Sequence, residues 1–495
     1  MRPPGRPGRS DDAPPTIAAV TTPVRILSVG AAAPDLRLPA SEVAAAWDRS
    51  GSGGARGQTA LCGPDEDVLT LAAAAAGRAL DASGLQHDIV DGLWWGTTRP
   101  PFAEGPSHAV LAAALGLSSH SAGALCSGSP HAGMDALLGA ADAVAAGTAR
   151  VALVVAADAL VPGTGTGYEA RAGAAAAAMV LVSEEQGSAA LTARVTRTQP
   201  VLDRYRGDRE AITRDLYDSR LFREEIFMPI VREVGEQLAA LDVRAWSLPD
   251  PDGRLGAAVA KKLGVGTPAS TTAYAAVGDT GAAAPLLGGV GALDAAGTVA
   301  IVGFGGGRAT GVAITADAPV RGAARVADAL AGGRPVSYTE ALRARGQLTA
   351  AGETIPMGVP PESASFVRGA DEILGLLGAR CVDCGTINTP PSIHPHCISC
   401  GSTKFELVPM ARRGVVHTFV VNHTMPAPFV APLPLAVIDL ADGARVMLQV
   451  TGRGDGLEIG TPVELVLRRY AYERGVPVYG FKAHAKTTAP SERPS

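Results

Sequence analysis

Two pairs of cysteines toward the C-terminal end place the tightest constraint on how this chain can fold. The sequence reads CVDC over residues 381–384 and CISC over residues 397–400. Two CxxC pairs separated by one loop are typical of four thiolates that hold a tetrahedral zinc ion. Redox use of either pair is the alternative. His394 and His396 lie in the loop but are surplus to a complete four-sulfur set. We therefore predict a structural zinc at Cys381, Cys384, Cys397 and Cys400.

Short β-rich segments with turn residues between them follow the cysteines. They are residues 414–421, 435–440, 444–450 and 462–467. Several strands of this length predict a small β-barrel of the OB-fold type. The segments carry no dense basic and aromatic surface, and the whole chain has a net charge of −5. We therefore expect no nucleic acid as a partner.

The N-terminal part of the chain alternates buried strands with Ala-rich helices. Strands are expected at residues 24–29, 89–96 and 150–156, and helices at 68–82 and 107–115, the first capped by acidic residues 65–67. A second round follows residue 191, with helices at 220–241 and from 258, and a strand at 299–302. Alternation of this kind predicts an α/β fold with parallel strands, built by internal duplication.

No apolar stretch of about 18 residues is free of glycine or charge, so no membrane span is expected. The first 23 residues are rich in proline and arginine and lack the apolar centre of a signal peptide, which predicts a disordered leader. Four of the six cysteines belong to the metal-type cluster. This usage indicates a cytoplasmic protein.

Cys126 is the candidate nucleophile. It lies in the string GALCSGSP, residues 123–130, after an apolar approach and before an Ala-rich run with helical spacing that starts at Gly133. We predict that this thiol lies at a helix N-terminus, where unpaired amides and the helix dipole favour the thiolate. A small buried cysteine in a tight turn is the alternative.

Several stretches resemble prokaryotic hydroxymethylglutaryl-CoA synthases. They are GPDEDVLT at residues 63–70, residues 122–134, AAVAKKLG at 257–264 and VSYTEALRARG at 336–346. Residues 24–348 are thereby similar to the thiolase superfamily, beside ketoacyl-ACP synthase III. The resemblance implies a five-layered αβαβα fold, a homodimer, and an acyl group carried on Cys126. Residues 366–483 resemble the zinc-ribbon and OB-fold domain that accompanies thiolase-type enzymes and binds acyl-CoA, notably at 414–419 and 478–481.

The acid and base of that family are missing here. Pro249 stands where the family has its histidine, and Thr98 where the synthases have glutamate. General acid–base help is worth about 10²–10⁴-fold in rate, so the carbon–carbon chemistry of the family should be crippled. Forming a thioester at Cys126 is less demanding, because a thiolate exchanges with a thioester without a strong base.

Asp279 replaces the asparagine of the ketoacyl synthases, and relatives that pass an acyl group to a hydroxyl or amine resemble this chain in that respect. We expect Asp279 to accept a proton from the acceptor; a turn cap before Gly281 is the alternative.

The amides of Cys126 and of one residue among Gly305, Gly306 and Gly307 are expected to form an oxyanion hole, worth about 3–4 kcal/mol per donor. A tight turn is the alternative for the glycines. His131 is expected to pack rather than catalyse, and a catalytic role is expected still less for His108 and His120.

The sequence divides as follows: a leader at 1–23, thiolase-like halves at 24–190 and 191–348, a linker at 349–365, a helix and zinc ribbon at 366–410, an OB-fold at 411–485 and a tail at 486–495. The leading hypothesis is an acyltransferase that takes an acyl group from acyl-CoA or acyl-carrier protein onto Cys126 and passes it to a hydroxyl, amine or carbon acceptor. Two alternatives remain. One is a condensing enzyme of the hydroxymethylglutaryl-CoA synthase type, and the other is a non-catalytic acyl-CoA-binding partner of another thiolase-like subunit.

Overall fold

The computed structural model describes residues 18–48, 57–183, 186–214, 219–348, 367, 369–425, 429, 431–473 and 475–485. The predicted linker and tail lie outside these residues, as does the predicted leader up to residue 17. Residues 18–23 are not leader, however, because they open the strand β1 (Ala18–Ala32), in which Ala18 and Ala19 pair with Arg194 and Ala193.

A nine-stranded sheet forms the core of the N-terminal part, in the order β5-β4-β6-β7-β1-β8-β11-β10-β9. β1 pairs with β7 on one side and β8 on the other, so it joins the two predicted halves of the fold. The other strands are β4 (Gly92–Thr97), β5 (Ala122–Ser127), β6 (Val151–Ala159), β7 (Ala174–Val182), β8 (Ala189–Thr198), β9 (Val243–Ser247), β10 (Gly297–Gly305) and β11 (Arg308–Ala316).

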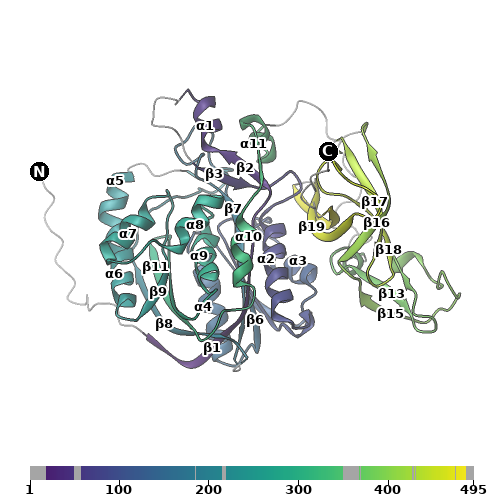
Figure 1. Cartoon of the computed structure of the whole chain (residues 1–495), viewed down its shortest axis with the longest axis horizontal. Coiled ribbons are helices and arrows are strands. Elements are labelled where there is room, and N and C mark those ends of the chain that lie inside the picture. The colour runs from purple at the N-terminus through teal and green to yellow at the C-terminus, as the bar shows by residue number, and fades with distance from the viewer. Residues whose placement is uncertain are drawn as a thin grey trace, which may run out of the picture.

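The helices lie in three layers, one between the two halves of the sheet and one on each outer face, which is the αβαβα arrangement that the resemblance implies (Figure 1). α4 (Ala132–Ala145), α8 (Ala269–Val277) and α9 (Ala284–Ala292) share one core cluster with both halves of the sheet. α2 (Val68–Ser83) and α3 (Ser107–Leu115) cover one outer face, and α6 (Met228–Ala239) and α7 (Leu255–Leu263) the other. Small residues let the inner layer pack closely: a Cβ on Gly133 in α4 would lie 2.1 Å from the carbonyl oxygen of Ala282, just before α9.

Local expectations hold along much of this region. Asp67 caps α2 through a capping box with Thr70, and Gly84 ends the helix in the left-handed conformation. The helix expected over 220–241 forms as α5 (Ser219–Leu221), a π-helical turn (Phe222–Phe227) and α6. Smaller elements complete this part: β2 (Leu36–Pro39), α1 (Ala40–Ala46), β3 (Gln58–Leu61), α10 (Val326–Leu330), β12 (Arg334–Pro335) and α11 (Tyr338–Ala344).

The C-terminal module, residues 369–485, contains two small sheets. β13 (Leu377–Cys381), β14 (Ile387–Asn388) and β15 (Phe405–Pro409) form the first. The second has the order β18 (Arg445–Gln449), β17 (Leu433–Leu440), β16 (Arg413–Asn422), β19 (Pro462–Glu473), β20 (Val476–Ala485). The helix expected at the start of the segment 366–410 is short: α13 (Ala370–Ile373) ends before Leu376, which has a positive φ of 52°, and Leu377 begins β13.

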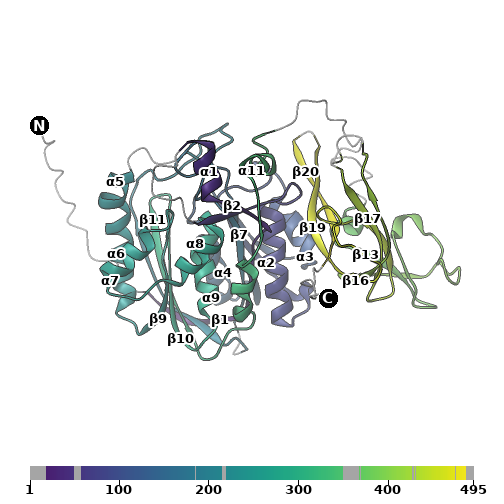
Figure 2. The ribbon, with the colours of Figure 1, turned by 45° about the horizontal axis from the view of Figure 1, so that its top comes forward.

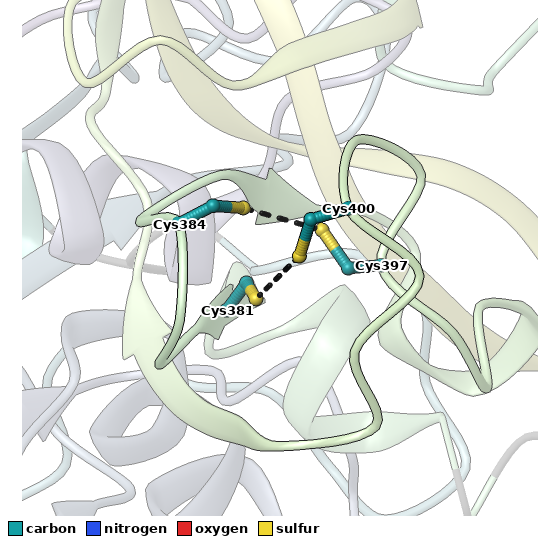
Figure 3. Close-up of side chains that lie close together, drawn as sticks. All are labelled: Cys381, Cys384, Cys397 and Cys400. Carbon is teal, nitrogen blue, oxygen red and sulfur yellow. Dashed lines mark hydrogen bonds between the residues drawn. The ribbon is translucent and has the colours of Figure 1, made fainter.

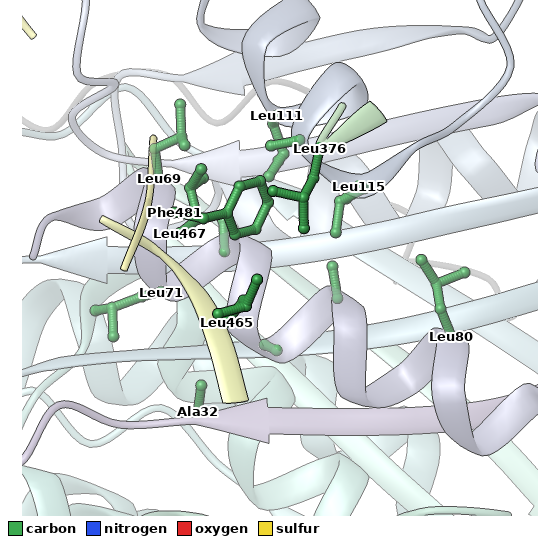
Figure 4. Packing of buried hydrophobic residues seen from close by; sticks show 14 of the residues in the cluster. Ala32, Leu69, Leu71, Leu80, Leu111, Leu115, Leu376, Leu465, Leu467 and Phe481 are labelled. Carbon is green, nitrogen blue, oxygen red and sulfur yellow. The ribbon is translucent and has the colours of Figure 1, made fainter. Parts of the chain in front are cut away.

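The C-terminal module packs on α2 and α3 through β19 and β20 (Figures 1 and 2). Figure 4 shows Leu465, Leu467 and Phe481 in one apolar cluster with leucines of both helices. Polar contacts surround this cluster at the start of α2. Lys482 Nζ lies 2.9 Å from a carboxylate oxygen of Asp65, and Tyr479 donates to Asp67 at 2.7 Å. The acids that the sequence assigned to helix capping therefore also hold the module.

Across the described ranges, none of the helices has the length and apolar character needed to cross a membrane.

Candidate functional site

A cavity of about 160 Å³ lies beside the glycine-rich turn between β10 and β11. It is comparable to an engineered cavity of about 150 Å³ that binds benzene, so it suits a small apolar group. Its aromatic wall is formed by Phe222, Phe227 and Phe304, whose rings contact one another edge-on or tilted. The polar lining includes Thr98, Arg99, Ser129, Tyr168, Asp203, Arg204, Tyr205, Arg206, Thr213, Asp250 and Asp279.

Cys126 is not at a helix N-terminus, which corrects the sequence prediction. It lies in β5, where it pairs with Gly96, and the strand continues to Ser127. α4 begins only at Ala132, after a turn that contains Pro130. The side chain of Cys126 packs with the inner-layer core, whereas Gly128, Ser129 and Pro130 line the cavity.

The electrostatic surroundings of Cys126 also differ from the expectation. Burial raises the pKa of this thiol, the charge of Asp135 raises it further, and Arg308 partly opposes both. The thiol is therefore less ionised at neutral pH than an exposed cysteine. Its assignment as the nucleophile remains a prediction from sequence.

Asp279 lines the cavity, but three groups already occupy its carboxylate. One oxygen accepts from the Tyr168 hydroxyl at 2.9 Å and from Arg204 at 3.1 Å, and the other accepts from the Gly281 amide at 3.0 Å. Arg204 also stacks on the Tyr168 ring, 3.8 Å from its centroid. Burial raises the pKa of Asp279, and the charge of Arg204 opposes that shift. Asp279 therefore both caps the turn at Gly281 and lines the cavity with its carboxylate.

The three glycines form the turn that closes β10 and β11. Gly306 and Gly307 have positive φ angles of 58° and 73°, which other residues rarely adopt. The Gly306 amide donates to Asp203 at 2.9 Å, so a carboxylate of this chain occupies a predicted oxyanion-hole donor. A Cβ on Gly305 would lie 2.6 Å from the amide nitrogen of His131, so only glycine fits where this turn packs against the loop after Cys126.

The two substituted acid–base positions both face the cavity. Thr98 donates its hydroxyl to Asp158 at 2.8 Å, and Pro249 lines the cavity next to Asp250. Burial raises the pKa of Asp158 to about 6. It also raises the pKa of Asp250 to about 6, although one oxygen of Asp250 accepts from the Leu255 amide at the start of α7.

His131 is buried, His108 is partly buried and His120 is exposed. One ring nitrogen of His131 lies 2.8 Å from the Thr310 hydroxyl and the other 2.9 Å from Arg308. His108 contacts the Leu93 carbonyl oxygen at 2.9 Å. Neither lines the cavity.

The four ribbon cysteines converge as the spacing predicts (Figure 3). Their sulfur atoms all lie within 4.8 Å of one another, and two pairs, Cys381 with Cys400 and Cys384 with Cys397, are 3.6 Å apart. Four sulfurs bound at about 2.3 Å to one zinc would be about 3.8 Å apart, so the cluster fits that ion. Backbone hydrogen bonds, first that of Cys400, lower the pKa of Cys397 to about 6, which favours a thiolate ligand.

Sequence reasoning missed the segment that closes the cavity. Asp203, Arg204 and Arg206 lie in residues 199–214, between β8 and α5, and Tyr168 lies between β6 and β7. This segment has no periodicity or motif that marks a site. A density of arginine, aspartate and tyrosine between a strand and a helix is the one available signal.

Comparison with known proteins accounts for the C-terminal module first. The family described as "ChsH2, rubredoxin-like zinc ribbon domain" matches residues 374–406, and "ChsH2, C-terminal OB-fold domain" matches residues 407–468. A DUF35 domain-containing scaffold protein of Methanocaldococcus jannaschii is 37% identical over 113 residues, which are 22% of this chain and 79% of that protein. The chain belongs to the DUF35-domain family. We refer to its C-terminal module, which contains the two matched ChsH2 domains, as the DUF35 module.

The N-terminal part is similar to the thiolase superfamily. A hydroxymethylglutaryl-CoA synthase of Methanococcus maripaludis is 30% identical over 159 residues, 31% of this chain and 46% of that protein, so the chain matches less than half of that relative. The solved structure titled "MvaS in complex with 3-hydroxy-3-methylglutaryl coenzyme A" covers 69% of this chain and 95% of its own, with a TM-score of 0.55 and 21% identity. The chain thus joins a thiolase fold to a zinc ribbon and an OB-fold.

Proposed function

We propose that the chain is an acyltransferase that accepts an acyl group from an acyl-CoA or acyl-carrier-protein thioester on Cys126 and passes it to a second substrate. The observation that carries the proposal is the cavity on a thiolase fold, which has an aromatic wall and polar groups and is lined by Gly128, two residues after Cys126. Similarity to hydroxymethylglutaryl-CoA synthases supports thioester chemistry in general. The substituted positions Thr98 and Pro249 argue against enolate formation, because neither side chain is a base.

Asp279 is proposed to take the proton of an incoming hydroxyl or amine. Its carboxylate faces the cavity, and the Arg204 ion pair keeps a charged form available despite burial. Deprotonation by Asp279 requires that one of its present contacts yield to the acceptor. Asp279→Asn should leave acylation largely intact and slow transfer by roughly 10²-fold or more.

Intact mass measured after incubation with a panel of acyl-CoAs tests the proposal. We expect an adduct equal to the acyl group in wild-type protein and in Cys62→Ser, and none in Cys126→Ser. Absence of an adduct for every donor would contradict the acyltransferase. Formation of hydroxymethylglutaryl-CoA from acetyl-CoA and acetoacetyl-CoA would favour the condensing enzyme instead.

A non-catalytic acyl-CoA-binding partner is the second candidate. It is favoured because groups of this chain already take up the hydrogen bonds of the site. The Gly306 amide donates to Asp203, and Arg204 and Tyr168 both donate to Asp279. The DUF35 scaffold relative supports a role with another subunit. Under this candidate, acyl-CoA binds without an adduct, which equilibrium binding combined with the mass measurement would show.

The chain is also proposed to form a homodimer through β5. This strand is at one edge of the nine-stranded sheet, and Ala122, Gly123 and Ala124 are exposed there. Unpaired edge strands of small apolar residues readily pair with another strand. Light scattering should show a dimer for wild-type protein and for the exposed control Ala146→Lys, and a monomer for Ala124→Lys.

A further inference from the structure

Two arginines lie side by side at the entrance of the cavity. Arg99 follows β4, Arg206 lies in the segment 199–214, and both line the cavity. Arg99 donates to the carbonyl of Ala211 at 2.5 Å, and Arg206 donates to the carbonyl of Glu210 at 3.1 Å. Because these two carbonyls are consecutive in the chain, one turn holds both guanidinium groups in place. Arg206 is exposed and Arg99 is half-buried, so the pair marks the opening.

Neither arginine has an acidic partner within the described parts of the chain. No ion pair found there includes Arg99 or Arg206. The carboxylate of Glu210 is held by Arg214, at 2.8 Å from its Nε, and by the Gly207 amide. Burial lowers the pKa of Arg99, and the charge of Arg206 lowers it further. Among the described residues these two cations have no counter-ion, and one of them is half-buried, so an anion would be attracted to them.

The DUF35 module comes near Arg99. Tyr472 near the end of β19 lies close enough to Arg99 for their charges to interact, and its own pKa is affected by Arg99. Arg469 stacks on the Tyr472 ring, 4.4 Å from its centroid, and donates to its hydroxyl at 2.9 Å. Arg99 therefore lies near a polar aromatic residue of the module, which itself does not line the cavity.

We propose that Arg99 and Arg206 bind an anionic group of the substrate, a carboxylate or a phosphate, at the entrance of the cavity. The planar guanidinium presents paired donors that match either group. Phe222, Phe227 and Phe304 line the same cavity, so the ligand class is an amphipathic anion with an apolar portion inside and a charged end outside. The inference deepens the proposed function, because it names the charge of the substrate that the same cavity takes.

Binding of two unreactive probes, glutarate and pyrophosphate, to the full-length protein tests the site by calorimetry at low ionic strength. We expect one probe to bind, with affinity falling about tenfold or more in Arg99→Ala and in Arg206→Ala, since a hydrogen bond to a charged group is worth about 1.5–3 kcal/mol. Arg99→Lys keeps the charge, so its affinity for the probe should lie between those of Arg99→Ala and the wild type. The control Arg209→Ala removes an exposed arginine of the same segment that pairs with Asp208, and should bind like wild type.

The two probes separate the sources of the anion. Preference for glutarate indicates a carboxylate on the acyl group or acceptor, and preference for pyrophosphate indicates a phosphate of the thioester donor. The proposal is overturned if neither probe binds wild-type protein, or if the alanine variants bind as tightly as Arg209→Ala while melting at the wild-type temperature. The probes carry no thioester, so a failure of Cys126 acylation with intact probe binding would contradict the proposed function alone.

Discussion

The zinc ribbon and the cavity are two candidate sites in one chain, and they are built in different ways. The ribbon takes all four sulfur atoms from residues 381–400, on two short turns beside a three-stranded sheet. The cavity takes its groups from segments as distant as Thr98, Asp203 and Asp279. A metal site of the first kind depends on local spacing. A site of the second kind depends on how whole layers pack, and its chemistry changes when one neighbour changes.

The sharpest test of the local site is removal of one ligand. Cys397→Ser should abolish most zinc binding, because structural zinc contributes about 10–16 kcal/mol in small zinc-binding peptides and three thiolates hold it far less well. Elemental analysis should give about one zinc per chain in wild type and almost none in the variant. His396→Ala, which changes a surplus residue of the same loop, should keep its zinc. Full zinc in Cys397→Ser would refute the assignment.

The second-largest effect is expected at the contact between the DUF35 module and the thiolase fold. Arg468 lies 3.1 Å from Glu66, with side-chain exposures of 13% and 14%. Arg468→Ala leaves Glu66 buried without its partner and should reduce the free energy of unfolding by about 3 kcal/mol.

The pH dependence of that loss follows from Glu66. Burial already raises the pKa of Glu66, and Arg468 is the first group that lowers it. Without Arg468 the carboxyl takes up a proton more readily, so the loss of stability should be larger at pH 8 than at pH 5. Chemical denaturation at both pH values measures this, with the exposed Lys404→Ala as control. A loss independent of pH would show that the ion pair does not carry the effect.

The rate of cysteine alkylation tests whether Cys126 is the activated thiol that its sequence motif predicts. Cys126 should react with iodoacetamide slowly at pH 7 and faster as the pH rises, because burial and Asp135 raise its pKa. It should still react about tenfold faster than Cys62, which is partly buried as well but whose pKa is raised well above the usual value.

Asp135→Asn removes one cause of the raised pKa and should speed the reaction of Cys126 at pH 7. Peptide mapping against time gives both rates. A fast reaction at pH 7 that Asp135→Asn leaves unchanged would restore the activated thiol that the sequence alone predicts.

The smallest expected effect concerns Asp203. Asp203→Ala frees the Gly306 amide, so acylation of Cys126 by a thioester should become several-fold faster if that amide polarises the thioester carbonyl. Rapid-quench mass measurement of the acyl-enzyme gives the rate, and Asp208→Ala in the same segment is the control. A slower reaction would mean that Asp203 helps to hold the cavity in shape rather than blocking it.

The sequence predicted those features that short-range patterns determine. Asp67 caps α2 because a carboxylate followed by a threonine three residues later forms a capping box wherever a helix starts. The CxxC spacing brought four sulfurs together, and resemblance to known synthases supplied the layered fold.

Long-range contacts explain what could not be predicted. Cys126 remains in a strand because β4 pairs with β5 through Ser127, and nothing in the string GALCSGSP reports that pairing. Asp203 reaches Gly306 across 103 positions of sequence, and Arg204 reaches Asp279 across 75. Such contacts exist only once the layers are packed, so residue patterns within a short window contain no trace of them.

The contact between Asp67 and Tyr479 has a consequence for how the two parts of the chain evolve. A covalent connection holds the DUF35 module near α2 at an effective concentration on the order of millimolar, so the contact surface needs little intrinsic affinity to stay occupied. Separate subunits must retain every strong contact or dissociate. A fused pair tolerates the loss of several contacts, and selection is then free to change residues such as Tyr472 in β19 without risking the assembly.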